Sequence, residues 1–220
     1  MKINSVQISP SFQKKLVAKA NVIKEKQPCP VSIYELTKKE DKDYFESLTV
    51  DGIWGLSEFA DDIAYDFKYS RYLKNFRGKE FNFYSMEDKD GNCLGIVEVD
   101  NSKIHKQNIN YIEAVPENSK KREKAVFLEK EKLKYKYIGE TMLAFLAKQQ
   151  ESKLIPKQIV VQSPLAQARN FYLNSYFCFD DKEMFLGSMH LPFENQVSLI
   201  EDNEKHTQAQ IELMRGKNVK

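Results

Sequence analysis

The stretch KYKYIGETMLAFLA, residues 134–147, decides the fold of this 220-residue chain. Its second half has apolar residues at helical spacing, whereas the residues before it are mainly charged. We therefore expect a helix from Ile138 to about Gln150. The residues that share its apolar face are Ile138, Met142, Phe145 and Leu146.

The start of this helix has features of an anion site. The first turn of any helix leaves four backbone N–H groups without intrahelical partners, and the helix dipole adds a partial positive charge there. Gly139 would let the backbone approach an anion closely, and Lys134 and Lys136 add positive charge. The sequence therefore predicts a phosphate-binding helix start.

Strand patterns lie on both sides of the predicted helix. Residues 81–86 and 93–99 flank an Asp/Gly/Asn turn and predict a β-hairpin. Residues 109–115 alternate and stop at Pro116, which cannot donate to a strand ladder. Residues 158–162 predict a short buried strand after the helix. A strand–helix–strand step is right-handed and brings its two strands close together.

The remaining elements complete a mixed α/β (α+β) arrangement around one sheet. We expect a single domain over 29–192, with a tail or arm over 1–28 and a polar tail or loose helix over 193–220. Further predicted elements are strands at 31–36, 177–179 and 184–191 and helices at 41–48, 56–69 and 166–175.

Composition limits the kind of protein this is. The net charge of +2 is too small to indicate a nucleic-acid or membrane partner by itself. Cys29, Cys93 and Cys178 form no CxxC pair, and the three histidines are isolated, so we predict no disulfide framework, no metal and a cytoplasmic location. Neither a signal peptide nor a membrane-spanning run of about 20 apolar residues is expected.

A second motif, ARNFYLNSYF at 168–177, follows the predicted strand at 158–162. Together the two motifs resemble those of GNAT-family N-acyltransferases. The family loop Arg/Gln-x-x-Gly-x-Gly/Ala is matched by Lys134, Tyr137 and Gly139, with Tyr137 in place of the first glycine. The family unit Ala-x-x-Phe-Tyr-x-x-x-Gly-Phe is matched over 168–177, with Tyr176 in place of the glycine, and Leu165 stands where the family often has Asn.

The resemblance implies a mostly antiparallel sheet with helices on both faces. It also implies that acetyl-CoA is the co-substrate and that its acetyl group moves to a primary amine by direct attack. The amine belongs to a small molecule, a peptide or a protein, and the chain is a monomer or a homodimer. The cofactor-binding residues it implies are Ala114, Val115, Lys134, Lys136, Tyr137, Ile138, Gly139, Glu140 and Thr141.

The resemblance also assigns catalytic roles. Tyr172 is expected to protonate the departing thiolate, because a phenol with a pKa near ~10 stays protonated at neutral pH. Its alternative is a core tyrosine packed beside Phe171. Glu113 is the expected base, because deprotonating a lysine-like amine at pH 7 costs roughly 4–5 kcal/mol. Its alternative is a solvated residue on an edge strand.

An acidic cluster lies in the predicted helix at 56–69. In the resembling family this region shapes the acceptor site, and acidic groups would attract a cationic amine. The alternative is the ordinary charged outer face of an amphipathic helix. The acidic residues are Glu58, Asp61, Asp62 and Asp66.

Two other functions remain open at the level of sequence. One is a non-catalytic acyl-CoA-binding or protein-interaction module, since two glycine positions of the motifs are substituted. The other is nucleic-acid binding through the basic run at 120–136, which the nearly balanced overall charge makes unlikely.

Overall fold

The computed structural model describes residues 14–37, 65–69, 74, 77–114, 135–162, 164, 166–180 and 187–214. These residues form one ten-stranded sheet in the order β10-β1-β2-β3-β4-β5-β7-β9-β8, with β6 paired to β1. All pairings are antiparallel except β5 with β7. The strands are β1 (Lys15–Lys24), β2 (Gln27–Leu36), β3 (Phe81–Asp88), β4 (Cys93–Asp100), β5 (Lys106–Ala114), β6 (Tyr135–Lys136), β7 (Gln158–Val161), β8 (Cys178–Phe179), β9 (Met189–Leu191) and β10 (Glu212–Leu213).

The predicted hairpin is confirmed as β3 and β4. Asp88 organises its turn, because its Oδ1 accepts from the backbone N–H groups of Asp90 at 3.0 Å and Asn92 at 2.9 Å. Gly91 has φ 81°, which favours glycine. The closing pair of strands is also confirmed, since β8 pairs with β9.

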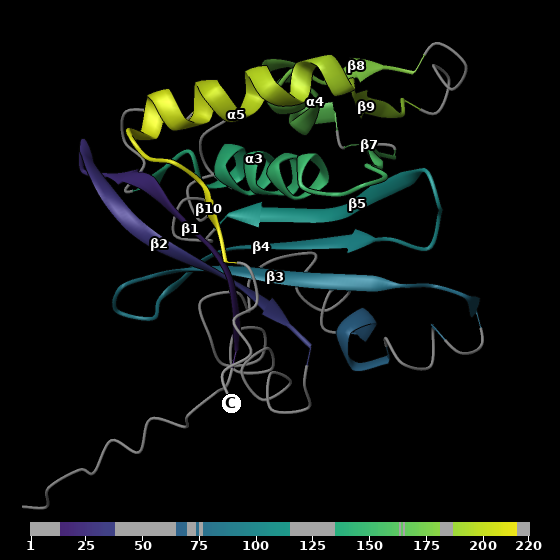
Figure 1. Ribbon diagram of the computed structural model, residues 1–220, viewed down its shortest axis with the longest axis horizontal. Coiled ribbons are helices and arrows are strands. Elements are labelled where there is room, and N and C mark those ends of the chain that lie inside the picture. The colour runs from purple at the N-terminus through teal and green to yellow at the C-terminus, as the bar shows by residue number, and fades with distance from the viewer. Residues whose placement is uncertain are drawn as a thin grey trace, which may run out of the picture.

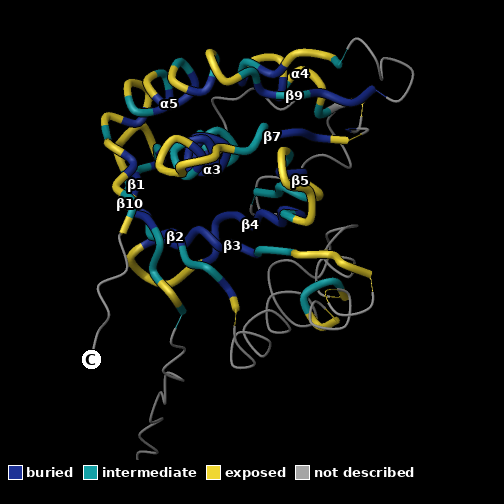
Figure 2. The backbone as a smooth tube through the Cα atoms, turned by 45° about the vertical axis from the view of Figure 1, so that its right-hand side comes forward, coloured by how far each residue is buried: buried dark blue, intermediate teal, exposed yellow. Residues whose placement is uncertain are grey.

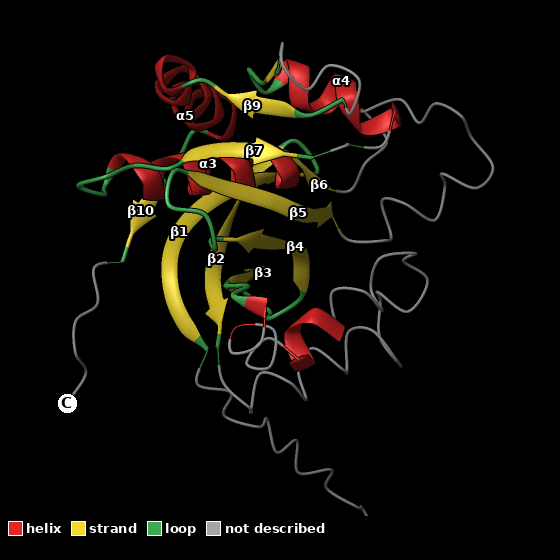
Figure 3. Ribbon diagram, turned by 90° about the vertical axis from the view of Figure 1, so that its right-hand side faces the viewer, coloured by secondary structure: helices red, strands yellow, loops and turns green. Residues whose placement is uncertain are grey.

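The predicted strand–helix–strand step is confirmed as β5, α3 (Ile138–Glu151) and β7, with the two strands paired in parallel. Every residue from Thr141 to Ala147 is buried, so α3 is enclosed on all sides. The sheet bends around it, and β1, β4 and β5 all contact it (Figures 1 and 3). The tube coloured by burial places α3 between the sheet and a second helix, α5 (Phe193–Thr207) (Figure 2).

The opposite face of the sheet also bears helical structure. Residues 65–69 are helical, and the Phe67 ring meets the Phe83 ring of β3 edge-on at 5.1 Å. Helices thus lie on both faces of a mostly antiparallel sheet, which confirms the predicted fold class. The predicted helix at 41–48 and the first part of the one at 56–69 lie outside the described residues.

The predicted N-terminal tail is wrong for residues 15–28, which form β1 and the start of β2. Ala18, Ala20 and Val22 alternate toward the core and are buried, but small residues between lysines give a weak strand signal. Pro28 and Pro30 lie within β2 because β3 pairs with it only from Val31 onward. At the prolines β2 therefore has β1 as its only described neighbour.

The helix predicted as one possibility for the C-terminal region is confirmed as α5, but it is packed rather than loose. Helix α5 packs on α3, and β10 adds a strand to β1. The buried positions of α5 have helical spacing, but three of the five are polar, so a search for apolar periodicity does not detect them. They are Gln196, Leu199, Ile200, Asn203 and Thr207.

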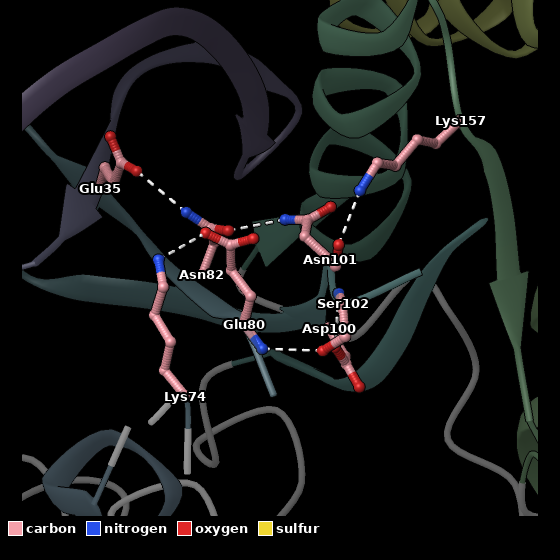
Figure 4. A network of polar contacts seen from close by, with 8 residues as sticks. All are labelled: Glu35, Lys74, Glu80, Asn82, Asp100, Asn101, Ser102 and Lys157. Carbon is pink, nitrogen blue, oxygen red and sulfur yellow. Dashed lines mark hydrogen bonds and ion pairs between the residues drawn. The ribbon is translucent and has the colours of Figure 1, made fainter. Parts of the chain in front are cut away.

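A chain of polar contacts joins the strands near the C-terminal end of α3 (Figure 4). Asn82 donates to Glu35 at 3.1 Å, and Asn101 donates to Asn82 at 2.6 Å. Lys157 donates to the carbonyl oxygen of Asn101 at 2.7 Å. These groups satisfy one another, so this end of the sheet is structural, and the open features described next lie at the other end of α3.

Candidate functional site

Helix α3 begins directly on the sheet. A Cβ added at Gly95 of β4 would come within 2.7 Å of the Ile138 side chain, so the glycine makes room for the first residue of the helix. The N–H of Thr141 closes the first turn on the carbonyl oxygen of Tyr137 at 2.9 Å. The N–H groups of Ile138, Gly139 and Glu140 have no acceptor among the described residues. Three unsatisfied donors therefore lie at this helix start.

Gly139 has a packing role that the sequence did not reveal. A Cβ at Gly139 would lie 2.9 Å from Cζ of Phe171, so the Phe171 ring occupies the space of a side chain. Phe171 belongs to α4 (Ala166–Asn174), the helix of the second motif. The two motifs are therefore in direct contact through one glycine and one aromatic ring.

Both tyrosines at the glycine positions of the motifs have left-handed backbone conformations. Tyr137 has φ 67° and Tyr176 has φ 68°. Such φ values favour glycine, because the Cβ of any other residue meets the backbone. The other described non-glycine residues with positive φ are Glu25 and Lys26 in the β1–β2 turn and Gln208 at the end of α5. The substituted positions therefore keep the backbone shape that a glycine would have.

Helix α5 explains why these positions hold tyrosine. The Tyr137 ring stacks on His206 at 5.4 Å between centroids, with 14° between the ring planes. The Tyr176 hydroxyl donates to Asp202, and this hydrogen bond raises the pKa of Tyr176. Each tyrosine thus connects a motif to the C-terminal helix.

Thr141 is engaged by α5 as well. Its hydroxyl accepts from Asn203 Nδ2 at 3.0 Å, and the residue is fully buried. Its N–H also closes the first turn of α3, so both its backbone N–H and its hydroxyl oxygen are engaged within the fold. The sequence placed it among the cofactor-binding residues, and we leave it out of the site proposed below.

The strain at Tyr137 predicts an unusual order of stabilities. Both Tyr137→Gly and Tyr137→Ala remove the ring, but only glycine relieves the positive φ, so we expect the Gly variant to be more stable by about 1 kcal/mol. Urea denaturation measures the difference. At Lys148, inside α3, the order should reverse, with Ala more stable than Gly by about 1 kcal/mol. An Ala variant more stable than the Gly variant at 137 would contradict the strain.

Strand β5 has an open edge near this helix start. It pairs with β7 only from Lys106 to Ile109. Asn110 forms a bulge against β4, because Val99 pairs with Ile109 whereas Glu98 pairs with Tyr111. Beyond the bulge, no described strand pairs with β5 on the β7 side.

The backbone groups on that edge can be assigned. The carbonyl oxygen of Glu113 points toward β4, 3.3 Å from the position of a Cβ at Gly95. Successive residues of a strand direct their backbone groups to alternate sides, so those of Ile112 and Ala114 point to the open edge. The sequence named Glu113, Ala114 and Val115 for this role; it missed Ile112, and Val115 lies outside the described residues.

Tyr172 has the properties of a proton donor. Its ring is 5% exposed and packs against Phe171 at 5.1 Å and Phe177 at 5.3 Å. Its hydroxyl oxygen has no hydrogen-bond partner among the described residues and is not fully enclosed. Burial raises the pKa of Tyr172 well above its ordinary value, so the phenol stays protonated at neutral pH.

The face of the sheet opposite α3 holds a titratable group that the sequence did not indicate. Glu98 of β4 is 0% exposed, and its Oε1 accepts from Asn110 Nδ2 at 2.6 Å. The pKa of Glu98 is raised to about 8, mainly by burial; the Asn110 hydrogen bond opposes the rise, and the Asp66 carboxylate adds to it. The available signal was a lone charge in the run GIVEV, residues 95–99.

Glu113, the predicted base, lies on this same face. Its cross-strand partner is Ile96, two residues before Glu98 on β4. The side chain is half-buried. Glu98 and Glu113 are therefore neighbours on two paired strands.

Only some of the other residues that the sequence names for the site are among the described residues. Lys136 is half-buried and pairs with Ile23 through β6 and β1, and Glu140 is half-buried in the first turn of α3. Lys134 and Leu165 lie outside the described residues, as does the basic run apart from positions 135 and 136.

Two features are absent from the described part of the chain. No group of three or more His, Cys, Asp or Glu side chains there is placed to hold a metal ion. In the same ranges, no helix has both the length and the apolar character needed to cross a membrane.

No protein-family model matches the chain, and no curated protein matches it. Among solved structures, it is similar to a chimera of the spermidine N-acetyltransferase SpeG from Vibrio cholerae and hSSAT (13% identity, TM-score 0.48, 76% of this chain and 98% of that chain covered). It is also similar to a GNAT-family acetyltransferase from Staphylococcus aureus Mu50 (12%, 0.43, 74% and 99%).

A third similar structure is FdhC, a nucleotide-linked sugar GNAT (14% identity, TM-score 0.49, 88% of this chain and 97% of that chain covered). All three TM-scores lie below 0.5, so these likenesses decide nothing about the activity of the chain. The proposal below rests on the chain's own residues.

Proposed function

We propose that this chain is an N-acyltransferase that moves an acetyl group from acetyl-CoA to a primary amine. The observation that carries the proposal is the meeting of two unsatisfied backbone surfaces. The free helix start of α3 rests, through Ile138, on Gly95, and Gly95 pairs with Ala114 on the open edge of β5. The glycine-like conformations of Tyr137 and Tyr176 support the motif alignment that led to the same function.

The proposed binding mode uses each surface for a different part of coenzyme A. The amide groups of the pantetheine arm pair with the outward backbone groups of Ile112 and Ala114, as an added strand would. The pyrophosphate accepts from the N–H groups of Ile138, Gly139 and Glu140 at the positive end of α3. Lys136, in β6 just before the helix, adds positive charge, and Lys134 precedes it in the sequence.

In the proposed reaction, the neutral amine attacks the thioester carbonyl carbon. A C–N bond forms, the C–S bond breaks, and Tyr172 gives its proton to the leaving sulfur and regains one from solvent. A carboxylate on the acceptor side takes the proton of the amine. Because Tyr172 keeps a protonated, reachable hydroxyl, we favour an enzyme over a non-catalytic acyl-CoA-binding module.

A proline at position 114 tests the binding mode. At 100 times its Kd, acetyl-CoA should stabilise the wild type by about 2.7 kcal/mol, a rise in Tm of roughly 5–11 °C for a chain of this size. Ala114→Pro removes an N–H that points to the open edge rather than to β4, so we expect a folded variant that loses most of this rise. Thermal melts with and without acetyl-CoA measure it.

The matched control is Glu113→Pro, one residue earlier. Its N–H points to β4, so this variant should lose a ladder hydrogen bond and melt at a lower temperature even without ligand. No rise in Tm for the wild type with millimolar acetyl-CoA would contradict the proposed function. A full rise for Ala114→Pro would contradict the role of the strand edge alone.

A further inference from the structure

Glu98 is an unusual residue for the middle of a sheet. Its side chain is 0% exposed, and its Oε2 has no hydrogen bond of good geometry among the described residues, although the Asp66 carboxyl lies close enough to raise the pKa of Glu98. Its cross-strand neighbours are Phe83 on β3 and Tyr111 on β5, neither of which is a cation. A buried carboxylate with an unsatisfied oxygen is unfavourable unless a proton or a cation neutralises it.

Several acidic groups lie near Glu98 among the described residues. Asp66 approaches from the helical residues 65–69, and Asp100 lies two residues along β4. Glu113 lies on the same face of β5. Lys79 is paired with Asp100 at 2.9 Å. None of the ion pairs among the described residues includes Glu98.

Glu98 also lies next to the point where the pairing between β5 and β7 ends. Its Oε1 is bonded to Asn110, the bulged residue after which β5 is no longer paired with β7. Asn110 is exposed, so the bulge connects the buried carboxylate with the surface. The open edge of β5, where the proposed acetyl donor would lie, begins at this same residue.

We propose that Glu98, flanked by Asp66, takes the proton of the acceptor, and that the acceptor is therefore a cationic primary amine. This inference rests on the proposed function. The ammonium group gives one proton to the Glu98 carboxylate, and the resulting neutral nitrogen attacks the thioester carbon. The second proton of that nitrogen leaves to solvent when the amide forms, and Glu98 then returns its proton to solvent.

The raised pKa suits this role. Moving a proton from a lysine-like ammonium to an ordinary glutamate is unfavourable by roughly 10⁶-fold, since their pKa values are about 10.4 and 4.3. With a pKa of about 8 for Glu98, the same transfer is unfavourable by only roughly 10²- to 10³-fold. A base is also most effective when its pKa lies near the working pH.

The test compares Glu98→Gln with wild type in two independent measurements. The first is the pH dependence of kcat/KM with acetyl-CoA and 1,5-diaminopentane. For the wild type we expect activity to rise with pH through an apparent pKa near 8, as Glu98 becomes charged. In Glu98→Gln, kcat/KM should fall by about 10²-fold, and its rise with pH near 8 should disappear. With glycinamide, whose α-amine has a pKa near ~8, the loss should be smaller.

Asp66→Asn sharpens the assignment. Removing the neighbouring negative charge should lower the pKa of Glu98, so the rise in kcat/KM should occur at lower pH. The control is Glu87→Gln, a buried glutamate of β3 paired with Lys14, which should keep the wild-type pH profile.

The second measurement is the stability of the ligand-free protein. Because the folded-state pKa of Glu98 lies above its unfolded value, the folded state holds the proton more tightly. Glu98 therefore lowers stability progressively as pH rises from about 4.5 to about 8. Glu98→Gln cannot ionise, so its Tm at pH 9 should exceed that of the wild type.

The outcomes separate this inference from the proposed function. The role of Glu98 is overturned if kcat/KM of Glu98→Gln still rises with pH near 8, or if its Tm at pH 9 is no higher than that of the wild type. Either result leaves the proposed acetyl transfer intact. Absence of turnover and of acetyl-CoA binding in the wild type overturns both.

Discussion

Tyr172→Phe is expected to lower kcat by about 10²- to 10³-fold and to leave acetyl-CoA binding unchanged. The variant keeps the ring, which packs between Phe171 and Phe177, and removes only the hydroxyl. That hydroxyl has no hydrogen-bond partner among the described residues, so its loss costs the fold little. The leaving thiolate would then depart without a proton donor.

Steady-state kinetics and acetyl-CoA melts together measure this effect. Tyr84→Phe is the matched control, because Tyr84 is as buried as Tyr172 and its pKa is likewise raised by burial. It packs on Phe145 inside the core, so its kcat should stay near the wild-type value. A kcat for Tyr172→Phe within about threefold of the wild type would make Tyr172 a core residue.

Phe145→Ala is expected to destabilise the chain by about 3–5 kcal/mol. Phe145 is 0% exposed at the centre of α3, and its ring meets Tyr84 edge-on at 5.1 Å. Because α3 is enclosed by the curved sheet on one side and α5 on the other, no single element can move in to fill the cavity. This loss is a large fraction of the 5–15 kcal/mol typical of a folded protein.

Urea denaturation gives the change in the free energy of unfolding directly. The control is Leu154→Ala, a residue 99% exposed beyond the end of α3, for which a change within about 0.5 kcal/mol is expected. A loss below about 1 kcal/mol for Phe145→Ala would mean that α3 is not the centre of the core.

The parts of the fold that could be predicted from the sequence are those with strong periodicity. The β3–β4 hairpin has two apolar runs and a turn organised by Asp88. Helix α3 and the strands β5 and β7 form a step that the handedness of such connections brings together. In each case the residues that specify the element lie within the element itself.

The packing of the two terminal regions could not be predicted, because its signals depend on distant partners. The buried face of α5 includes Asn203, which is satisfied only by Thr141 in α3. A polar residue in that position indicates a solvated helix until its partner is known. In β1, the inward residues Ala18 and Ala20 are small, so their alternation among lysines is weak.

The sequence indicated which kinds of residue form the candidate site, but not their backbone conformations or their contacts. Tyr137 and Tyr176 resemble defects in a glycine motif, and their positive φ values and their contacts with α5 are properties of the folded chain. Glu98 belongs to β4, all of whose residues are buried, whereas a charged residue in a strand ordinarily indicates an exposed face. Only the folded structure brings Asp66 beside it and buries both of its oxygens.

The central claim is that acetyl-CoA binds between the open edge of β5 and the start of α3. The most direct test is an amide NMR titration of the wild-type chain with acetyl-CoA. The account predicts that the amide signals of Ile112, Ala114, Ile138, Gly139 and Glu140 shift together with one Kd, whereas those of Glu113 and of β10 move little. Saturating acetyl-CoA that leaves these five signals in place, or shifts signals elsewhere instead, would contradict it.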